Sequence, residues 1–321
     1  MKKLSLLTLI LTSVFMLNCS IDDENSTAPS TSFELNPNDF QGTIQNGTVS
    51  LNPTENYRLT GALVVKEGAT LNIPAGTIIT AAAGTTTSAF IGVERGATIN
   101  INGTASNPVV MTAETQSAGA WGGLAIAGYG ITNAGVDVTS EVGDLTYGGT
   151  DNTDSSGSIT YLRVEYTGAT FTNDKEFNGV TLFGVGSGTI FKNVSSVNGG
   201  DDGIEFFGGA VDAENLVSIN SGDDSIDFAD GFTGSITNAY IKGITKAGIE
   251  GSNNGDDGSL EPVTTATISK CSSENPNGFT VTPAPIEVIS TAREMNVGVI
   301  RIRMVLKDKP TTRGTNGRIV A

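Results

Sequence analysis

The chain has 321 residues, with 34 acidic against 18 basic side chains and a formal net charge of −16 at pH 7. This balance argues against nucleic acid or an anionic lipid surface as the main partner. The sequence contains no histidine, which excludes Ser-His-Asp and Cys-His catalysis and removes the commonest zinc ligand. Its 41 glycines and few aromatic residues are typical of many short strands joined by tight turns.

The N-terminus has the pattern of a signal peptide. Two lysines precede an apolar stretch, residues 4–17, that is too short to span a bilayer as a helix. The stretch ends at Met16-Leu17-Asn18-Cys19, which resembles the lipobox of bacterial lipoproteins, although Asn18 stands where a small residue is usual. An ordinary secretory signal with a chance cysteine is the alternative. We expect residues 1–18 to be removed and Cys19 to carry lipid.

Residues 19–35 indicate a polar tether. Ser20-Ile21-Asp22-Asp23-Glu24 resembles the acidic tract that follows the acylated cysteine of Bacteroidota surface lipoproteins, and the rest is rich in Ser, Thr, Asn and Pro. The resemblance implies a lipid anchor in the outer membrane and a protein that faces the cell exterior. The second cysteine, Cys271, has no partner for an intramolecular disulfide and is expected to be a small buried or half-buried residue of a late strand.

The repeats begin in the N-terminal half of the expected main domain, residues 36–290. Val65–Ile73 matches Val93–Ile101, 28 residues later, and each copy has Gly-Ala-Thr followed by alternating apolar residues. This pattern predicts a turn and then a strand. Residues 129–156 interrupt the pattern with Gly, Asp, Thr and Ser, and we expect a long loop that projects from one coil.

A shorter and stronger repeat follows. Gly200–Phe206 recurs as Gly222–Phe228, 22 residues later, with weaker copies at Lys246–Glu250 and Asn178–Leu182. A period of this length suits one coil of a parallel β-helix, in which each strand pairs with the equivalent strand of the next coil. A leucine-rich repeat is the competing solenoid, but no L-x-x-L-x-L series and no helical period appear. We predict an all-β fold, a right-handed parallel β-helix of roughly nine coils of 22–28 residues.

Equivalent positions of the coils should stack on one another. Two apolar columns are predicted to point inward: Val180, Ile204, Ile226 and Ile249, and Leu182, Phe206 and Phe228. The intervening residues are predicted to point to solvent, because strand side chains alternate: Thr181, Glu205, Asp227 and Glu250. Three asparagines are predicted to form an internal ladder: Asn193, Asn215 and Asn238.

The last segment, residues 291–321, has seven basic and two acidic residues, and the regular turn spacing stops there. Either the end is truncated or altered, or it is a genuine basic cap or tail. A β-helix without a cap would expose the strand edges of its last coil.

Four segments together resemble a family of Bacteroidota surface proteins with parallel β-helix repeats: Ala120–Leu124, Gly157–Tyr166, Glu176–Val180 and Asp201–Gly209. The resemblance covers about residues 55–260. It implies a parallel β-helix at the cell surface. It implies no reaction, because the family has no established biochemical role.

Six acidic residues on adjacent coils form the candidate site: Asp201, Asp202, Glu205, Asp223, Asp224 and Asp227. Carboxylates on facing coils and turn carbonyls suit calcium, which takes 6–8 oxygen ligands. We expect that the protein requires no cofactor, although calcium is a candidate ligand of these acids. Turn-capping side chains, multiplied by duplication of the repeat, are the alternative. Lys246 aligns with Asp201 and Asp223, and is either a salt bridge that closes the acidic column or the proton acceptor of a lyase.

A repeated Gly-Asp-Asp on a β-helix resembles a motif of polygalacturonases, but the accompanying His-Gly step is missing and Arg301–Arg303 lies in the basic tail. Trp121, the single tryptophan, is either a sugar-stacking platform or a packing residue near a coil turn. The incomplete catalytic set favours a non-catalytic surface protein that binds extracellular polysaccharide or another surface through an acidic face. The alternative is a polysaccharide lyase or glycoside hydrolase that acts on polyuronates.

Overall fold

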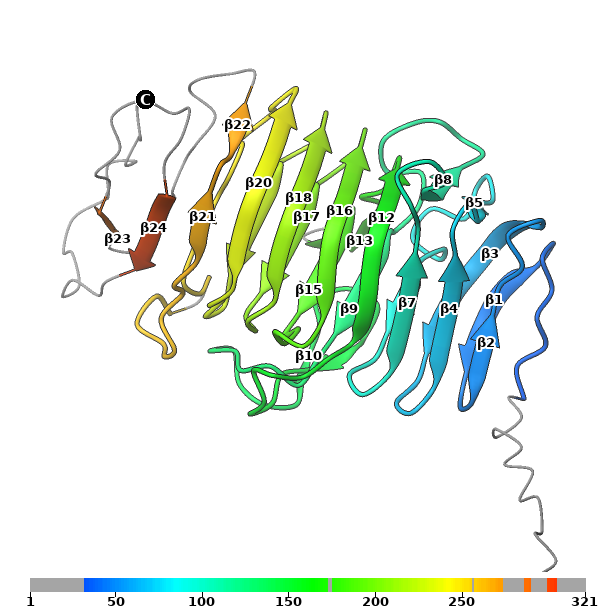
Figure 1. The fold of residues 1–321 in the computed structure, drawn as a ribbon, viewed down its shortest axis with the longest axis horizontal. Helices are drawn as coiled ribbons and strands as arrows, with labels where there is room; N and C mark the ends of the chain where they lie inside the picture. The colour runs from blue at the N-terminus through cyan, green and yellow to red at the C-terminus, as the bar shows by residue number, and fades with distance from the viewer. Residues whose placement is uncertain (1–31, 173–174, 256, 274–285, 290–298, 305–321) are drawn as a thin grey trace, which may run out of the picture.

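The computed structural model describes residues 32–172, 175–255, 257–273, 286–289 and 299–304, and all its regular elements in these ranges are β-strands. Most strands belong to one sheet and pair in parallel with the strand of the next coil. Figure 1 shows the coils stacked along the long axis, with the first coil at the right. The fold is the predicted right-handed parallel β-helix. Within the described residues, no helix is long and apolar enough to cross a membrane.

The strands form three columns, which we name faces A, B and C. Face A contains β1 (Phe40–Ile44), the second half of β3 (Asn56–Val65), β6 (Ile91–Val93), β9 (Leu124–Ala127), β15 (Val180–Phe183), β17 (Ile204–Phe207) and β19 (Ile226–Ala229). Face B contains β2 (Thr48–Ser50), β4 (Thr70–Pro74), β7 (Thr98–Asn102), the first halves of β12 (Gly157–Glu165), β16 (Ile190–Val197), β18 (Asp212–Ile219) and β20 (Ser235–Lys242), and β21 (Thr267–Ser269).

Face C contains the first half of β3, β5 (Ile78–Ala81), β8 (Val109–Ala113), the second halves of β12, β16, β18 and β20, and β22 (Ser272–Ser273). Because face B receives one strand from each coil, β2, β4, β7, β12, β16, β18, β20 and β21 mark eight coils in the described residues. This number is one fewer than the roughly nine expected.

The core follows the predicted columns. Val180 pairs with Ile204 and Ile204 with Ile226, while Phe206 pairs with Phe228, and all these side chains are buried. Ile249 extends the first column through an isolated bridge to Ile226. The 28-residue repeat is also confirmed, since β4 and β7 pair with that offset along their whole length. Like side chains therefore stack on like, as the repeat predicted.

The asparagine ladder forms, but it is not internal. Asn215 Nδ2 donates to Asn193 Oδ1 (3.0 Å) and Asn238 Nδ2 donates to Asn215 Oδ1 (2.6 Å). Each asparagine has a positive φ, 57–63°, at the bend between faces B and C, a conformation that asparagine tolerates better than most residues. Asn193 and Asn215 are half-buried and Asn238 is exposed, so the prediction of an internal ladder is wrong. A second, unpredicted ladder joins Asn220 to Asn198 at the next turn.

Residues 129–156 fold back over the outer surface of face A; we name them the covering segment. They contain the hairpin of β10 (Val138–Thr139) and β11 (Thr146–Tyr147). Three of their side chains are buried with outward residues of face A and neighbouring aromatic rings: Val142, Leu145 and Tyr147. The segment also reaches later coils, because the Asn133 backbone N–H donates to Asp230 O (3.0 Å) and its Nδ2 donates to Asn253 O (3.1 Å).

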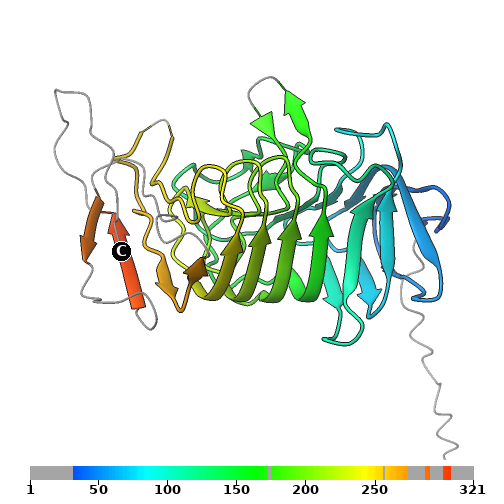
Figure 2. The ribbon, with the colours of Figure 1, turned by 90° about the horizontal axis from the view of Figure 1, so that it is seen from above.

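The outward column of face A is consequently not open to solvent. Thr181 is 1% exposed and Glu205 is 8% exposed, while Asp227 and Glu250 are half-buried. The prediction that these four residues point to open solvent is wrong, because non-repetitive chain covers the sheet. A second hairpin, β13 (Thr170–Thr172) with β14 (Lys175–Glu176), stands out from the stack (Figure 2).

The end of the stack is covered by an antiparallel strand. β23 (Ile286–Ile289) and β24 (Val299–Met304) form an antiparallel pair, and β24 also pairs with β21 in the antiparallel sense. β24 therefore occupies the edge of face B, where an unpaired strand would otherwise be exposed. The remainder of the expected basic tail lies outside the described residues.

Candidate functional site

The predicted acids lie at two equivalent turns and on the strands that follow them. Asp201 and Asp202 precede β17, and Asp223 and Asp224 precede β19 one coil later. The second residues of these strands, Glu205 and Asp227, pair directly across the two coils. The local fold results from the 22-residue repeat, which fixes the register and so places the acids of one coil beside those of the next.

All six predicted acids come together, and Glu250 joins them from the eighth coil. Their carboxylate oxygens form three overlapping groups with oxygens within 4.8 Å of one another: Asp201, Asp202 and Asp223; Asp202, Glu205 and Asp227; Asp224, Asp227 and Glu250. Two ionised groups at this distance repel by about 1 kcal/mol in water and by about 3–4 kcal/mol at an effective dielectric constant of 20. The cluster therefore requires protons or cations.

Burial makes this requirement stronger. It raises the pKa of Asp202 and Glu205 well above the usual range, and the neighbouring carboxylates raise both further. Burial is also the main cause that raises the pKa of Asp201 to about 6, of Asp227 to about 7 and of Asp224 to about 8. At neutral pH an unliganded cluster would therefore retain protons.

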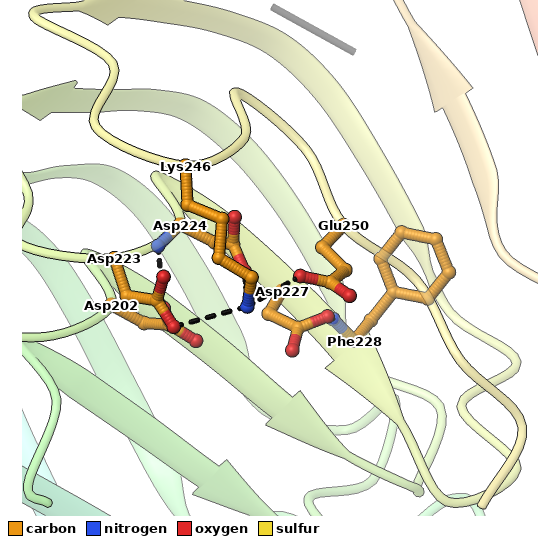
Figure 3. Close-up of polar contacts among 7 residues, drawn as sticks. All are labelled: Asp202, Asp223, Asp224, Asp227, Phe228, Lys246 and Glu250. Carbon is orange, nitrogen blue, oxygen red and sulfur yellow. Dashed lines mark hydrogen bonds and ion pairs between the residues drawn. The ribbon is translucent and has the colours of Figure 1, made fainter. Parts of the chain in front are cut away.

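Lys246 supplies one built-in cation (Figure 3). Its Nζ lies 3.1 Å from Asp223 Oδ2, 3.0 Å from Asp224 Oδ2 and 2.9 Å from Glu250 Oε2. Burial disfavours the ammonium, but its bonds to these three carboxylates outweigh that effect and raise the pKa of Lys246. Burial likewise favours neutral Glu250, but hydrogen bonds with Asp224 and Lys246 outweigh it and lower the pKa of Glu250. The predicted salt bridge is confirmed.

An amide from the preceding coil completes the cluster. Asn178 precedes β15, at the position that Asp202 occupies before β17, and its Nδ2 donates to Glu205 Oε2. Its buried Oδ1 has no hydrogen-bond partner among the described residues, and the same is true of Asp224 Oδ1. Asn178 and Glu250 were not predicted as site residues, although both belong to the weaker copies of the repeat. Alignment of all four copies by position would have found them.

The covering segment contributes one further acid. Burial raises the pKa of Glu141 to about 7; Lys175 opposes this shift, whereas Asp201 and Asp230 add to it. Glu141 was not predicted as a site residue, because it lies outside the repeats. Its charge nevertheless acts on the cluster, since it also helps to raise the pKa of Glu205.

Two other candidate residues, Trp121 and Cys271, lie in surroundings that indicate a structural role. Trp121 is fully buried and its Nε1 donates to Glu165 O (2.8 Å), so it packs near a coil turn and offers no platform for a sugar. Cys271 is half-buried, as predicted, but it lies between β21 and β22 rather than within a strand, and burial raises the pKa of its thiol to about 11. Cys19 lies outside the described residues.

The comparisons with known proteins agree with this architecture. The family model described as a pectate-lyase-like β-helix domain matches residues 42–282, more than half of the chain, and the match includes the whole acidic cluster. No curated protein and no solved structure shows a match. The chain belongs to the family of pectate-lyase-like β-helix domains.

Proposed function

We propose that this protein is a lipid-anchored protein of the bacterial outer membrane, exposed on the cell surface, that binds extracellular polysaccharide without cleaving it. The family fold is compatible with glycan binding and with a polysaccharide lyase. The observation that favours binding is the environment of Lys246, the cation among the acids. Because three carboxylates hold its ammonium and raise its pKa, Lys246 is poorly suited to accept a proton from a sugar.

The spacing of the acids supports the same conclusion for hydrolysis. The two carboxyl groups of a glycosidase are about 5–5.5 Å apart in retaining enzymes and about 6.5–9.5 Å apart in inverting enzymes. Within each of the three acidic groups the oxygens are closer, within 4.8 Å, and Asp224 and Glu250 are hydrogen-bonded to one another. Such a pair leaves little room for a glycosidic bond between its members.

A polysaccharide lyase or glycoside hydrolase that acts on polyuronates is the second candidate. One observation favours it: the pKa of Asp224 is raised to about 8, whereas that of Glu250 is lowered. Opposite shifts in adjacent carboxyl groups are typical of acid and base pairs in active sites. The two candidates differ in their products, because only an enzyme releases new sugar ends.

The corner of faces B and C offers a surface suited to sugars. The asparagine ladder follows this corner, and Tyr240, two residues after Asn238, is 39% exposed. Aromatic rings and amides commonly line ligand sites together, the ring supplying apolar area and the amides hydrogen bonds. Tyr240 can provide the aromatic surface that buried Trp121 cannot.

The decisive experiment screens the purified protein against a panel of neutral and acidic polysaccharides. Affinity electrophoresis would measure retention, while assays for reducing ends and unsaturated products would measure cleavage. We expect retention without products, and we expect Tyr240→Ala to weaken retention. Val136→Ala is the matched control, because Val136 is an exposed apolar residue of the covering segment. Sugar release that is lost in Asp224→Asn would establish the enzyme instead.

The membrane anchor needs a separate test. Cells that are fed an alkyne fatty acid should label the wild-type protein and not Cys19→Ser. Protease added to intact cells should digest the labelled protein if it faces the exterior. Equal labelling without Cys19, or release of the wild-type protein into the medium, would contradict the anchor.

A further inference from the structure

Face C presents an outward surface between two bends of the coils. The strands β12, β16, β18 and β20 lie side by side there, and the second half of each has two outward side chains (Figure 1). In coils five to seven these side chains form two columns, which we name the face C strip: Ser195, Val217 and Tyr240, and Val197, Ile219 and Lys242. Val197, Val217 and Ile219 are half-buried and belong to neither hydrophobic cluster of the described residues. Apolar side chains that gather on an outer surface are typical of interaction sites.

Amide side chains border the strip at both bends. The ladder of Asn193, Asn215 and Asn238 follows the bend between faces B and C. At the other bend, Asn220 Nδ2 donates to Asn198 Oδ1 (2.9 Å). Each ladder bond uses one of the two N–H groups of the donating amide. The amides can therefore also donate to hydroxyl groups of a ligand that lies on the strip.

Tyr161 stands at the ladder position of the fourth coil. The register of β12 and β16 makes it equivalent to Asn193. Its φ is 49°, a conformation that asparagine tolerates and that is unfavourable for a bulky side chain. Tyr161 is half-buried and belongs to neither hydrophobic cluster of the described residues, so core packing does not offset this cost. Backbone strain of this kind is typical of functional positions.

We propose that the face C strip, with Tyr161 at the fourth coil and Tyr240 at the seventh, binds an uncharged linear polysaccharide that runs along the axis of the stack. This inference rests on the proposed function, and it names the ligand class and the surface. The apolar side chains and the tyrosine rings contact the faces of the sugar rings, while the amides at the bends donate to their hydroxyl groups. The acidic cluster lies on face A and is not part of this surface.

The spacing of the coils favours a polymer as the ligand. Parallel strands lie about 4.8 Å apart, which is close to the length of one sugar unit in an extended chain. From the fourth to the seventh coil the surface therefore repeats its contacts about once per sugar unit, over roughly 14 Å. A single sugar would use one of these steps, whereas a chain uses several at once.

The charges of the strip favour an uncharged chain. Lys242 is the single charged member of the strip, and none of its members is acidic. In the fourth coil, Arg163 and Glu165 precede the two columns and form an ion pair with each other. A polyuronate would meet one cation on the strip, and the net charge of −16 would repel it. An uncharged polysaccharide is free of this repulsion.

The test measures retention of the purified full-length protein by affinity electrophoresis in soluble β-glucan, galactomannan, arabinoxylan, polygalacturonate and alginate. We expect at least one of the three uncharged polysaccharides to retain it, and neither polyuronate. Val217→Asp places a carboxylate in the middle of the strip and should lower the affinity at least tenfold, because the charge loses water under the ligand. Thr237→Asp, an outward position of face B, is the matched control and should keep the wild-type affinity.

Tyr161→Asn separates binding from folding. It restores the residue of the ladder, so the melting temperature should stay the same or rise, while the affinity should fall several-fold because the ring is lost. If an uncharged polysaccharide binds Val217→Asp and Tyr161→Asn as well as the wild type, the strip is not the site and the inference is overturned, although the proposed function stands. Retention by the polyuronates alone would overturn it in the same way.

Two further outcomes would also count against the strip. Retention by no polysaccharide at all would contradict the proposed function itself, and this inference with it. A dimer in analytical ultracentrifugation that Val217→Asp dissociates and Thr237→Asp does not would show that the strip binds a second copy of the chain instead. We expect the wild type and both variants to sediment alike.

Discussion

Two outer surfaces of the same stack differ in how their charged side chains are arranged. On face B, Lys192 lies above Glu214 of the next coil, with Nζ 2.8 Å from Oε2, and both side chains are nearly half exposed. On face A, Glu205 lies above Asp227, so like charges stack where the covering segment excludes water. The exposed surface has the charge pairs of ordinary solvated strands, whereas the covered surface accumulates unfavourable charge. Clusters of buried acids with strongly shifted pKa values are typical of functional sites.

The largest effect is expected when an acidic side chain is placed on the inward side of face A, whose outward side is already acidic. Ile226→Asp places a carboxylate in the core next to Asp227, which is acidic already but points outward. We expect loss of about 4 kcal/mol or more, or complete unfolding, because nothing inside the coil can neutralise the charge. Thermal melting followed by circular dichroism measures it, with Thr237→Asp on the outer side of face B as control. Similar melting of the two variants would show that the columns are misassigned.

The next prediction compares the two lysines. Lys246→Met leaves Asp223, buried Asp224 and Glu250 without their cation, and should cost about 1–3 kcal/mol, reduced because the lysine is 52% exposed. Lys192→Met removes an exposed pair and should lower the stability less, because solvent screens the pair. Thermal melting compares the two variants, and adding Asp224→Asn to Lys246→Met should recover part of the loss. If Lys192→Met proves the more damaging, the contrast between faces A and B is wrong.

A similar or smaller loss of stability is expected at the corner of faces B and C. Asn215→Ala removes two ladder hydrogen bonds and places alanine at a φ of 59°, so it should cost about 1–2 kcal/mol. Asn215→Gly loses the same bonds but tolerates the backbone conformation. Chemical denaturation should therefore find the glycine variant more stable than the alanine variant. The reverse order would mean that backbone conformation contributes little to the corner.

The smallest effect is a pH dependence from the covering segment. Burial raises the pKa of Glu141 from 4.5 to about 7, so the folded chain binds its proton more tightly than the unfolded chain. The associated stability is present below pH 4.5 and is lost as the pH rises towards 7. Glu141→Gln should therefore raise the melting temperature by a few degrees at pH 8 and change it little at pH 4. A gain of the same size at both pH values would exclude titration of this carboxyl.

The sequence predicted the stack well because the repeat offset determines the register. Once Ile204 and Ile226 are equivalent, alternation decides which side chains point inward, and the structure confirms both apolar columns. Alternation could not predict what lies outside the sheet. Glu205 is buried because residues 129–156, which have no repeat, bring apolar side chains onto face A. The acidic cluster could be located from the sequence, but its burial could not.

The contacts of Asn133 have a consequence for how the molecule unfolds. A solenoid is normally a one-dimensional array, in which each unit touches only its neighbours and the ends can unravel one unit at a time. Asn133 instead connects the fourth coil to Asp230 in the seventh coil and to Asn253 in the eighth coil, 120 positions further along the chain. Coils four to eight should therefore open as one cooperative block. Under mechanical pulling, the first three coils would unfold at low force. The block of coils four to eight would then unfold in a single step at higher force.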